Sequence, residues 1–331
     1  EPKGVNLILP ECLEDNEISP IKTYFGGKEG TGKYTWFRNK EKLDNLEFDL
    51  VAASSEVVGE TLKYKPSLDD VGFYLILYWV PTRCDGKIGD PLMAISDDPV
   101  VAGRPKIEKL EIEGRGFHTN LYAVQGTYSG GKEGKSKIQW LRAMVGSPDL
   151  ISIPGEIGRT YEANVDDVGY RLVAIYTPVR EDGVEGQPIS VSTEQIAVEP
   201  EIYREVKQKL DDGSVKFEVL CDKDRTPKKA QVMGHLERRV LEVNRKRIKV
   251  VKPGSKTSFP STEVRGTYAP PFHVELYRND QHRFKIVVDS DNEVDLMVQT
   301  RHMRDLIILT IRGLAQKFNS TSLNTLLKIE A

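Results

Sequence analysis

The segment with the clearest potential for chemistry is GGKEGTGKY, which covers residues 26–34. Gly27 and the Gly32–Lys33 pair match the G-x-x-x-x-G-K part of a phosphate-binding loop, in which backbone N–H groups and a lysine hold phosphate oxygens. The next position needs a hydroxyl group for a magnesium ion but holds Tyr34. The sequence after it predicts a strand, whereas the motif requires a helix. We therefore interpret this segment as a structural turn and not as a nucleotide site.

Two pairs of carboxylates, Asp69–Asp70 and Asp166–Asp167, could bind a metal ion or act as acid and base. Both pairs are followed by Val-Gly, which is typical of a turn whose Asp side chain accepts hydrogen bonds from backbone N–H groups. We predict that they are turn residues. The five histidines are scattered, and the sequence contains no G-x-S-x-G nucleophile motif. We expect a protein that is not an enzyme, with no catalytic residue, metal, cofactor or small-molecule substrate.

A cluster of basic residues is the feature that most favours a binding function. Residues 200–331 contain 25 Lys and Arg against 18 Asp and Glu, whereas residues 1–199 contain 22 against 32. Such a cluster attracts an acidic protein surface or an anionic membrane. A solvated, charged edge of a domain is the alternative that the sequence leaves open. The candidate residues for binding an anionic partner are Lys223, Arg225, Lys228, Lys229, Arg238, Arg239, Arg245, Lys246 and Arg247. Nucleic acid is not expected, because aromatic residues do not alternate with these basic ones.

The cysteines and the hydropathy pattern suggest a compartment. Cys12, Cys84 and Cys221 are far apart and odd in number, which favours reduced thiols in the cytoplasm over a disulfide framework. The longest apolar run, residues 73–80, has the length of a strand and is too short to cross a bilayer. We expect a soluble piece of a larger protein.

An internal repeat positions these residues. Gly26–Gly30 recurs as Gly130–Gly134, and Trp36 recurs as Trp140 at a spacing of 104 residues. The Asp-Asp pairs recur at a spacing of 97, so the first copy is seven residues longer between its Trp and its Asp pair, a difference expected in a loop. We predict two tandem domains of a common size, at residues 1–102 and 103–199.

Each repeat is predicted to consist of β-strands. Residues 33–38 and 137–142 alternate around the Trp, and Asp-Gly pairs at 85–86 and 182–183 indicate hairpin turns. A strand with a Trp, followed by Asp-x-Gly before a later apolar strand, resembles the immunoglobulin-like sandwich. Ile76 and Val173 stand where the second disulfide cysteine would be. We expect two immunoglobulin-like β-sandwiches that are stabilised by core packing alone.

Residues 200–331 have a different pattern. Ile202, Val206 and Leu210 predict a short helix that ends at Asp212–Gly213. Six strands are predicted next, at residues 215–220, 236–243, 247–251, 271–277, 283–288 and 293–299, before a long helix at residues 303–318. This order of elements resembles a pleckstrin-homology-like β-barrel with a C-terminal helix. In such domains the first loop, here residues 223–229, binds inositol phosphate headgroups, so a phosphoinositide-binding function is the alternative.

Longer runs of sequence are much more specific. YSGGKEG at 128–134, IQWLR at 138–142, ANVDDVGYRL at 163–172 and EVNRKRIKVVKPG at 242–254 resemble the plant microtubule-associated family called auxin-induced in root cultures nine. The resemblance covers essentially the whole chain and implies the last two immunoglobulin-like repeats and the terminal domain. It implies a cytoskeletal scaffold of cell division that docks partner proteins at cortical microtubules, the preprophase band, the phragmoplast and the cortical division site. In that family the basic microtubule-binding region lies upstream, so this piece would contribute localisation and protein contacts.

Overall fold

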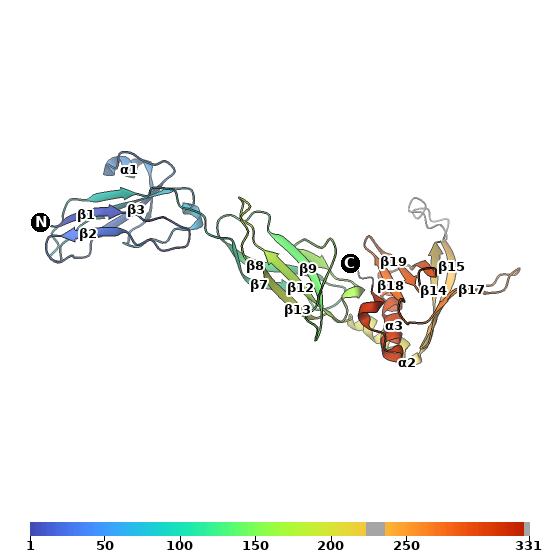
Figure 1. The fold of residues 1–331 in the computed structure, drawn as a ribbon. Coiled ribbons are helices and arrows are strands. Elements are labelled where there is room, and N and C mark those ends of the chain that lie inside the picture. Colours follow the sequence, from blue (N-terminus) through green and yellow to red (C-terminus); the bar gives the residue numbers. More distant parts are fainter. Residues whose placement is uncertain (223–235, 328–331) are drawn as a thin grey trace. The chain divides into compact units, whose positions relative to one another are not determined.

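The computed structural model describes residues 1–222 and 236–327 (Figure 1). The chain forms two compact units. The first unit comprises residues 1–111, 124–139 and 174–191, and the second comprises residues 112–123, 140–173 and 192–331. The second repeat therefore contributes residues to both units.

The first repeat has a pair of antiparallel strands and a four-stranded sheet with the order β4-β3-β5-β6. Its strands are β1 (Lys3–Ile8), β2 (Ile21–Phe25), β3 (Lys33–Asn39), β4 (Glu56–Gly59), β5 (Tyr74–Val80) and β6 (Leu92–Ile95). Trp36 on β3 is completely buried and stacks on Tyr64, with 5.5 Å between the ring centroids. Its indole N–H donates to the Thr61 carbonyl oxygen at 2.7 Å. The strand predicted around this Trp is confirmed.

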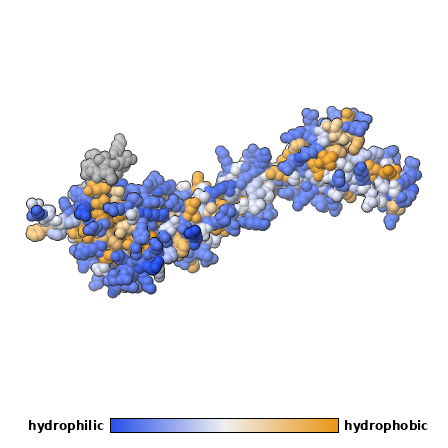
Figure 2. Space-filling view, turned by 180° about the vertical axis from the view of Figure 1, so that it is seen from behind, coloured by the Kyte–Doolittle hydropathy of each residue, from blue (hydrophilic) through white to orange (hydrophobic). Residues whose placement is uncertain are grey.

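Helix α1 (Phe48–Ser54) lies in the part of the first repeat that is longer than its counterpart. The prediction of a loop there was wrong. Val51 is the buried residue of the helix and packs with Phe37 and Ile76, while Phe48 and Leu50 are exposed. Two helical turns are too short to show a clear period in the sequence. Figure 2 shows apolar side chains at the surface of this repeat.

The second repeat has sheets with the orders β11-β8-β7 and β10-β9-β12-β13. Its strands are β7 (Lys106–Glu113), β8 (Leu121–Ser129), β9 (Lys137–Met144), β10 (Leu150–Ser152), β11 (Thr160–Glu162), β12 (Tyr170–Thr177) and β13 (Ile189–Gln195). Trp140 is buried against Tyr161 at 5.4 Å between centroids and donates to the Gly158 carbonyl oxygen at 2.8 Å. The arrangement around the Trp of the first repeat is thus reproduced. Within the described residues, none of the three cysteines forms a disulfide.

The Asp-Asp pairs form short 3-10 turns, η1 (Leu68–Asp70) and η2 (Val165–Asp167). The second acid of each pair is completely buried. Asp70 accepts the Ser67 N–H and Asp167 accepts the Asn164 N–H, both at 2.9 Å. Each acid also contacts an arginine and a tyrosine of its own repeat, which are Arg38 and Tyr64 in the first and Arg142 and Tyr161 in the second. The prediction that these acids hold turns is confirmed for Asp70 and Asp167.

The glycine-rich segment is a turn between strands. It leaves β2 at Phe25 and enters β3 at Lys33, so no helix follows it. Gly26 and Gly130 have positive φ angles of 106° and 100°. A Cβ atom at Gly26 would lie 2.3 Å from the Glu1 carbonyl oxygen, and one at Gly130 would lie 2.1 Å from that of Arg104. Both the backbone angle and the close approach require glycine, which supports the interpretation of this segment as a structural turn.

The rest of the chain begins with α2 (Pro200–Asp212), which ends at Gly213 as predicted. Gly213 has the left-handed conformation. A seven-stranded antiparallel sheet has the order β17-β16-β15-β14-β20-β19-β18. Its strands are β14 (Ser214–Asp222), β15 (Leu236–Asn244), β16 (Ile248–Lys252), β17 (Ser261–Gly266), β18 (His273–Tyr277), β19 (Asp280–Val287) and β20 (Glu293–Met297). Helix α3 (Arg301–Asn319) and the short turn η4 (Leu323–Leu326) follow. The apolar face of α3 packs into the same core as the sheet (Figure 1).

The sheet corrects two expectations. In the described part of the chain it does not close into a barrel, because β17 and β18 are its two edges and do not pair with each other. Strand β17 was not predicted, because Val264 is its only buried residue and the others give no alternation of apolar and polar side chains. The pleckstrin-homology-like order of strands with a C-terminal helix is confirmed.

Candidate functional site

The predicted basic residues do not form one cluster in the described part of the chain. Lys223, Arg225, Lys228 and Lys229 lie outside the described residues. Arg238 on β15 is exposed. Arg239 is only 2% exposed and donates to Glu263 at 2.8 and 3.0 Å and to Glu237 at 3.0 Å. Its guanidinium group is therefore already paired within the domain.

The remaining three, Arg245, Lys246 and Arg247, are exposed in the turn between β15 and β16. Strands β14 and β15 pair from Ser214–Asn244 to Asp222–Leu236. The turn therefore lies at one end of this hairpin, and Asp222 and Leu236 lie at the other. Nine paired residues at about 3.4 Å each put these ends roughly 30 Å apart. The three exposed basic residues of the turn are therefore far from Asp222 and Leu236.

Ionisable side chains do come together at two junctions. The first junction is where the chain passes from the first repeat to the second, and the second junction is where it passes from the second repeat to residues 200–331. At the first junction Glu14 is 5% exposed. Its carboxylate oxygen Oε2 accepts the Gly103 N–H at 2.9 Å and the Gly131 N–H at 2.7 Å. Gly131 belongs to the glycine-rich turn of the second repeat. A charged acceptor that takes two backbone donors fixes the link between the repeats.

Arg180 completes this first junction. Its Nη1 donates to the carbonyl oxygens of Ala102 and Gly103 at 3.2 and 2.8 Å. The same guanidinium binds both carboxylate oxygens of Asp182 at 2.8 Å, which fixes its orientation. The linker thus contacts the second repeat through both its N–H and its C=O groups.

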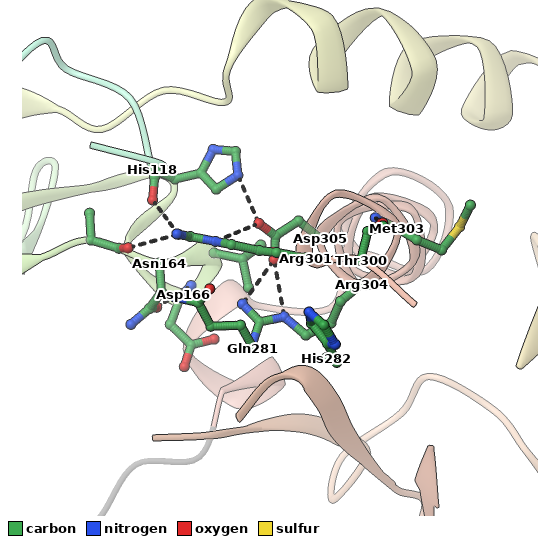
Figure 3. Close-up of polar contacts among 12 residues, drawn as sticks. His118, Asn164, Asp166, Gln281, His282, Thr300, Arg301, Met303, Arg304 and Asp305 are labelled. Atoms are coloured by element: carbon green, nitrogen blue, oxygen red, sulfur yellow. Dashed lines mark hydrogen bonds and ion pairs between the residues drawn. The ribbon is translucent and has the colours of Figure 1, made fainter. Parts of the chain in front are cut away.

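At the second junction His118 faces Asp305 of α3 (Figure 3). Both side chains are completely buried, with 3.4 Å between the imidazole Nε2 and the carboxylate Oδ2. The imidazole Nδ1 accepts the Glu199 N–H at 3.3 Å, which places the ring proton on Nε2, toward the carboxylate. The imidazole thus bridges the backbone ahead of α2 and the first turns of α3.

Two arginines of α3 complete the surroundings of Asp305. Arg304 donates to Oδ1 at 3.1 and 3.2 Å, and Arg301 lies 3.5 Å from Oδ2. Arg301 also donates to the carbonyl oxygens of His118 and Ala163, at 3.3 and 3.0 Å (Figure 3). Burial alone would raise the pKa of Asp305, but the nearby His118 imidazole and the charges of the arginines lower it below its ordinary value of 3.8.

A third arginine of α3 reaches the Asp-Asp turn of the second repeat. Arg312 is 2% exposed and donates to Asp166 at 2.7 Å and to the Val274 carbonyl oxygen at 3.1 Å. The equivalent acid in the first repeat, Asp69, is exposed. The first acid of the pair, predicted to be only a turn residue, therefore also binds α3 in the second repeat.

Sequence reasoning missed the equivalence of Glu14 and His118. The Glu14 N–H donates to Val101, and the His118 N–H donates to Ala197, at the same place in each repeat. The repeat spacing grows from 103 at Pro2–Pro105 to 104 at Gly26–Gly130, so one residue is inserted between these points. Allowing for that insertion aligns Glu14 with His118. The alignment could have been made from the sequence. It was missed because the two aligned positions hold different residue types, Glu and His, and so do not form a recognisable motif.

A polar cleft of about 490 Å³ borders the second junction and includes Arg142, Arg278, Arg301 and Arg304 in its lining. Arg142 contacts Asp167 at 2.6 Å, Arg301 lies 3.4 Å from Glu162, and Arg304 binds Asp305. Three of its four guanidinium groups are therefore paired with carboxylates of the same unit.

Within the described residues, no group of three or more His, Cys, Asp or Glu side chains is arranged to hold a metal ion. No helix in that part of the chain has both the length and the apolar composition needed to cross a membrane.

Residues 5–96 and 106–193 each match the family described as the AIR9 A9 domain, and residues 222–318 match the AIR9 PH-like domain. The chain belongs to the AIR9 family. The 187-kDa microtubule-associated protein AIR9 of Arabidopsis thaliana is 42% identical to it in an alignment that covers 99% of this chain. The chain corresponds to 31% of the length of that AIR9 protein.

Proposed function

We propose that this chain is a non-enzymatic part of a microtubule-associated scaffold, in which three domains at residues 1–102, 103–199 and 200–331 dock partner proteins. The observation that carries the proposal is that the buried ionisable residues have structural roles. Asp70 and Asp167 hold turns, while Glu14, His118 and Asp305 build junctions. Groups that could have done chemistry stabilise the architecture of a repeat array, and the named relative is a microtubule-associated protein.

The finer location follows the resemblance noted in the sequence. The proposed sites of action are cortical microtubules, the preprophase band, the phragmoplast and the cortical division site, in the cytoplasm. Residues 1–199 carry more acidic than basic side chains, so electrostatic attraction would not hold them on an acidic microtubule surface. Partner proteins would therefore mediate the attachment.

The test is proximity labelling in dividing plant cells with the full chain fused to a biotin ligase. We expect enrichment of proteins from microtubule arrays over the ligase alone, while the purified chain alone pellets weakly with microtubules. Labelling that matches the ligase alone would contradict the scaffold. For the absence of catalysis, millimolar ATP or GTP should leave the melting temperature unchanged, because a ligand that binds the folded state raises it by mass action.

One observation favours a second candidate function, binding to an anionic membrane. Phe259 is 93% exposed in the connection between β16 and β17, near the exposed Lys256. The register of β14–β16 puts this connection at the same end of the sheet as Asp222 and Leu236. An exposed aromatic ring close in sequence to an exposed lysine suits a membrane interface.

Vesicle co-sedimentation tests this second function. The full chain should pellet with vesicles that contain phosphatidylserine or a phosphoinositide, but not with phosphatidylcholine alone. Phe259→Ser, and separately Lys228→Glu with Lys229→Glu, should each reduce pelleting several-fold. Phe25→Ser is the matched control, since Phe25 is 58% exposed in the first repeat. Pelleting that all these variants leave unchanged would rule out this membrane site.

A further inference from the structure

The glycine-rich turns of the two repeats present the same donors in different surroundings. In the second repeat Gly131 is buried, and its N–H binds the Glu14 carboxylate at 2.7 Å. In the first repeat the equivalent Gly27 has a similar backbone, with φ of 89° against 70°, but is exposed. The fold of the turn is therefore maintained without a carboxylate bound to it.

The arginines beside these turns show the same contrast. Arg83 binds Asp85 through two hydrogen bonds at 2.8 and 2.6 Å, just as Arg180 binds Asp182. The side chain of Arg180 is 16% exposed because its Nη1 also binds the linker carbonyl oxygens, whereas that of Arg83 is 32% exposed. The Asp in each case fixes the guanidinium in a position to receive a linker.

The chain entering each repeat is also placed alike. Gly26 approaches the Glu1 carbonyl oxygen as Gly130 approaches that of Arg104, and Gly89 approaches the Pro2 carbonyl oxygen as Gly186 approaches that of Pro105. A linker joined ahead of Glu1 along the path that Ala102 and Gly103 take would therefore pass the Arg83 guanidinium.

We propose that Gly27 and Arg83 form a docking site for another immunoglobulin-like repeat. The Gly27 N–H binds a carboxylate at that repeat's equivalent of Glu14, and Arg83 binds two carbonyl oxygens of its linker. This deepens the proposed scaffold function, on which it rests, by naming the chemistry of one partner. A second copy of this chain does not supply this carboxylate, since Glu14 and His118 are both engaged within their own chain.

The test adds residues 1–103 ahead of Glu1 of the full chain, so that the added Glu14 and linker can reach the original Gly27 and Arg83. Thr31→Ser in the added copy, at an exposed position, distinguishes the two glycine-rich peptides by mass. We expect amide hydrogen exchange of the original turn to slow by roughly tenfold or more, since the Gly27 N–H would then be hydrogen-bonded to a charged acceptor. The added copy's own turn, with no repeat ahead of it, should keep the fast exchange and is the internal control.

Glu14→Gln in the added copy alone should speed exchange at the original Gly27. Equal exchange with and without the added repeat would overturn the proposal. The unextended chain gives a second measurement that does not depend on how the added copy folds. There Gly131 should exchange at least roughly tenfold more slowly than Gly27, and Glu14→Gln should speed the exchange of Gly131, because a neutral amide oxygen is a weaker acceptor than a carboxylate. Protection of Gly131 that Glu14→Gln leaves unchanged would also overturn it. Neither result depends on partner labelling in cells, so this proposal and the scaffold can fail separately.

Discussion

Glu14 and His118 occupy the same position in the two repeats, and each contacts the part of the chain that follows its own repeat. Glu14 is an anion that accepts two neutral N–H groups. His118 is an imidazole that accepts one N–H group and faces a carboxylate between two arginines. The backbone of the repeat is unchanged, so the choice of one side chain adapts it either to another repeat or to the terminal domain.

The two junctions differ in how much charge they bury. The first buries one carboxylate against backbone donors, and its arginine remains partly exposed. The second buries Asp305, Arg304 and Arg312, each no more than 2% exposed. Removing one member of a buried ion pair leaves an uncompensated charge, which costs more than losing a partly exposed contact. The second junction should therefore be the more sensitive to mutation.

Asp305→Ala should have the largest effect. It leaves the buried Arg304 guanidinium and the His118 imidazole without their carboxylate, so the free energy of unfolding should fall by about 3–5 kcal/mol. Urea denaturation measures the loss, and hydrogen exchange assigns it to the second unit. Asp291→Ala, at an exposed carboxyl, is the control and should change the stability by less than about 0.5 kcal/mol. Equal effects of the two variants would show that the cluster adds nothing to stability.

The Asp-Asp turns provide a matched pair of substitutions. Asp166→Asn removes the charge that faces the buried Arg312 and should cost about 1.5–3 kcal/mol. Asp69→Asn makes the same chemical change at the exposed equivalent in the first repeat and should cost less than about 0.5 kcal/mol. Thermal denaturation of both variants checks this. A similar loss in both would mean that the acid serves its own turn and not the junction.

The dependence of stability on pH tests the charge of Asp305. Its pKa is lowered in the folded state, because His118, Arg304 and Arg301 outweigh the effect of burial. Ionised Asp305 therefore stabilises the fold above its ordinary pKa of 3.8, and this contribution is lost as the pH falls through the folded-state value. The free energy of unfolding, measured by urea at several pH values from 6 to 2.5, should fall less steeply below pH 4 in Asp305→Asn. A slope identical to that of the unmodified chain would contradict this role.

Much of the fold was predictable because its signals are local. Buried Trp36 and Trp140 stand on alternating strands, and the helix that ends at Gly213 has both a period and a stop signal. Strand β17 and helix α1 were missed because each buries a single side chain, Val264 and Val51, which gives no period to read. Closure of a barrel depends on pairing between the edge strands β17 and β18, which periodicity within each strand does not report.

The site was less predictable than the fold. The sequence directed attention to basic residues, but Arg239 pairs with two glutamates, and Arg245 lies at the end of the β14–β15 hairpin opposite Asp222 and Leu236. The junctions were missed because Glu14 and Asp305 contact groups far away along the chain. Glu14, for example, binds a backbone N–H 117 residues further on. A backbone N–H does not depend on the type of side chain, so the composition and spacing of the sequence cannot reveal which N–H the carboxylate binds.

The smallest expected effect separates the two arginines of the glycine-rich turns. Arg180→Lys replaces a planar fork that holds Asp182 and two linker carbonyl oxygens by a single ammonium group, and should cost about 1 kcal/mol. Arg83→Lys should destabilise the same chain less than Arg180→Lys does, because it loses only the partly exposed pairing with Asp85. Urea denaturation of both variants measures the difference. In the chain extended by an added repeat, Arg83→Lys should become as costly as Arg180→Lys, since its guanidinium would then bind a linker as well. If Arg83→Lys still lowers the free energy of unfolding less than Arg180→Lys in the extended chain, the contrast between the two turns is a property of the repeats themselves and not of what they bind.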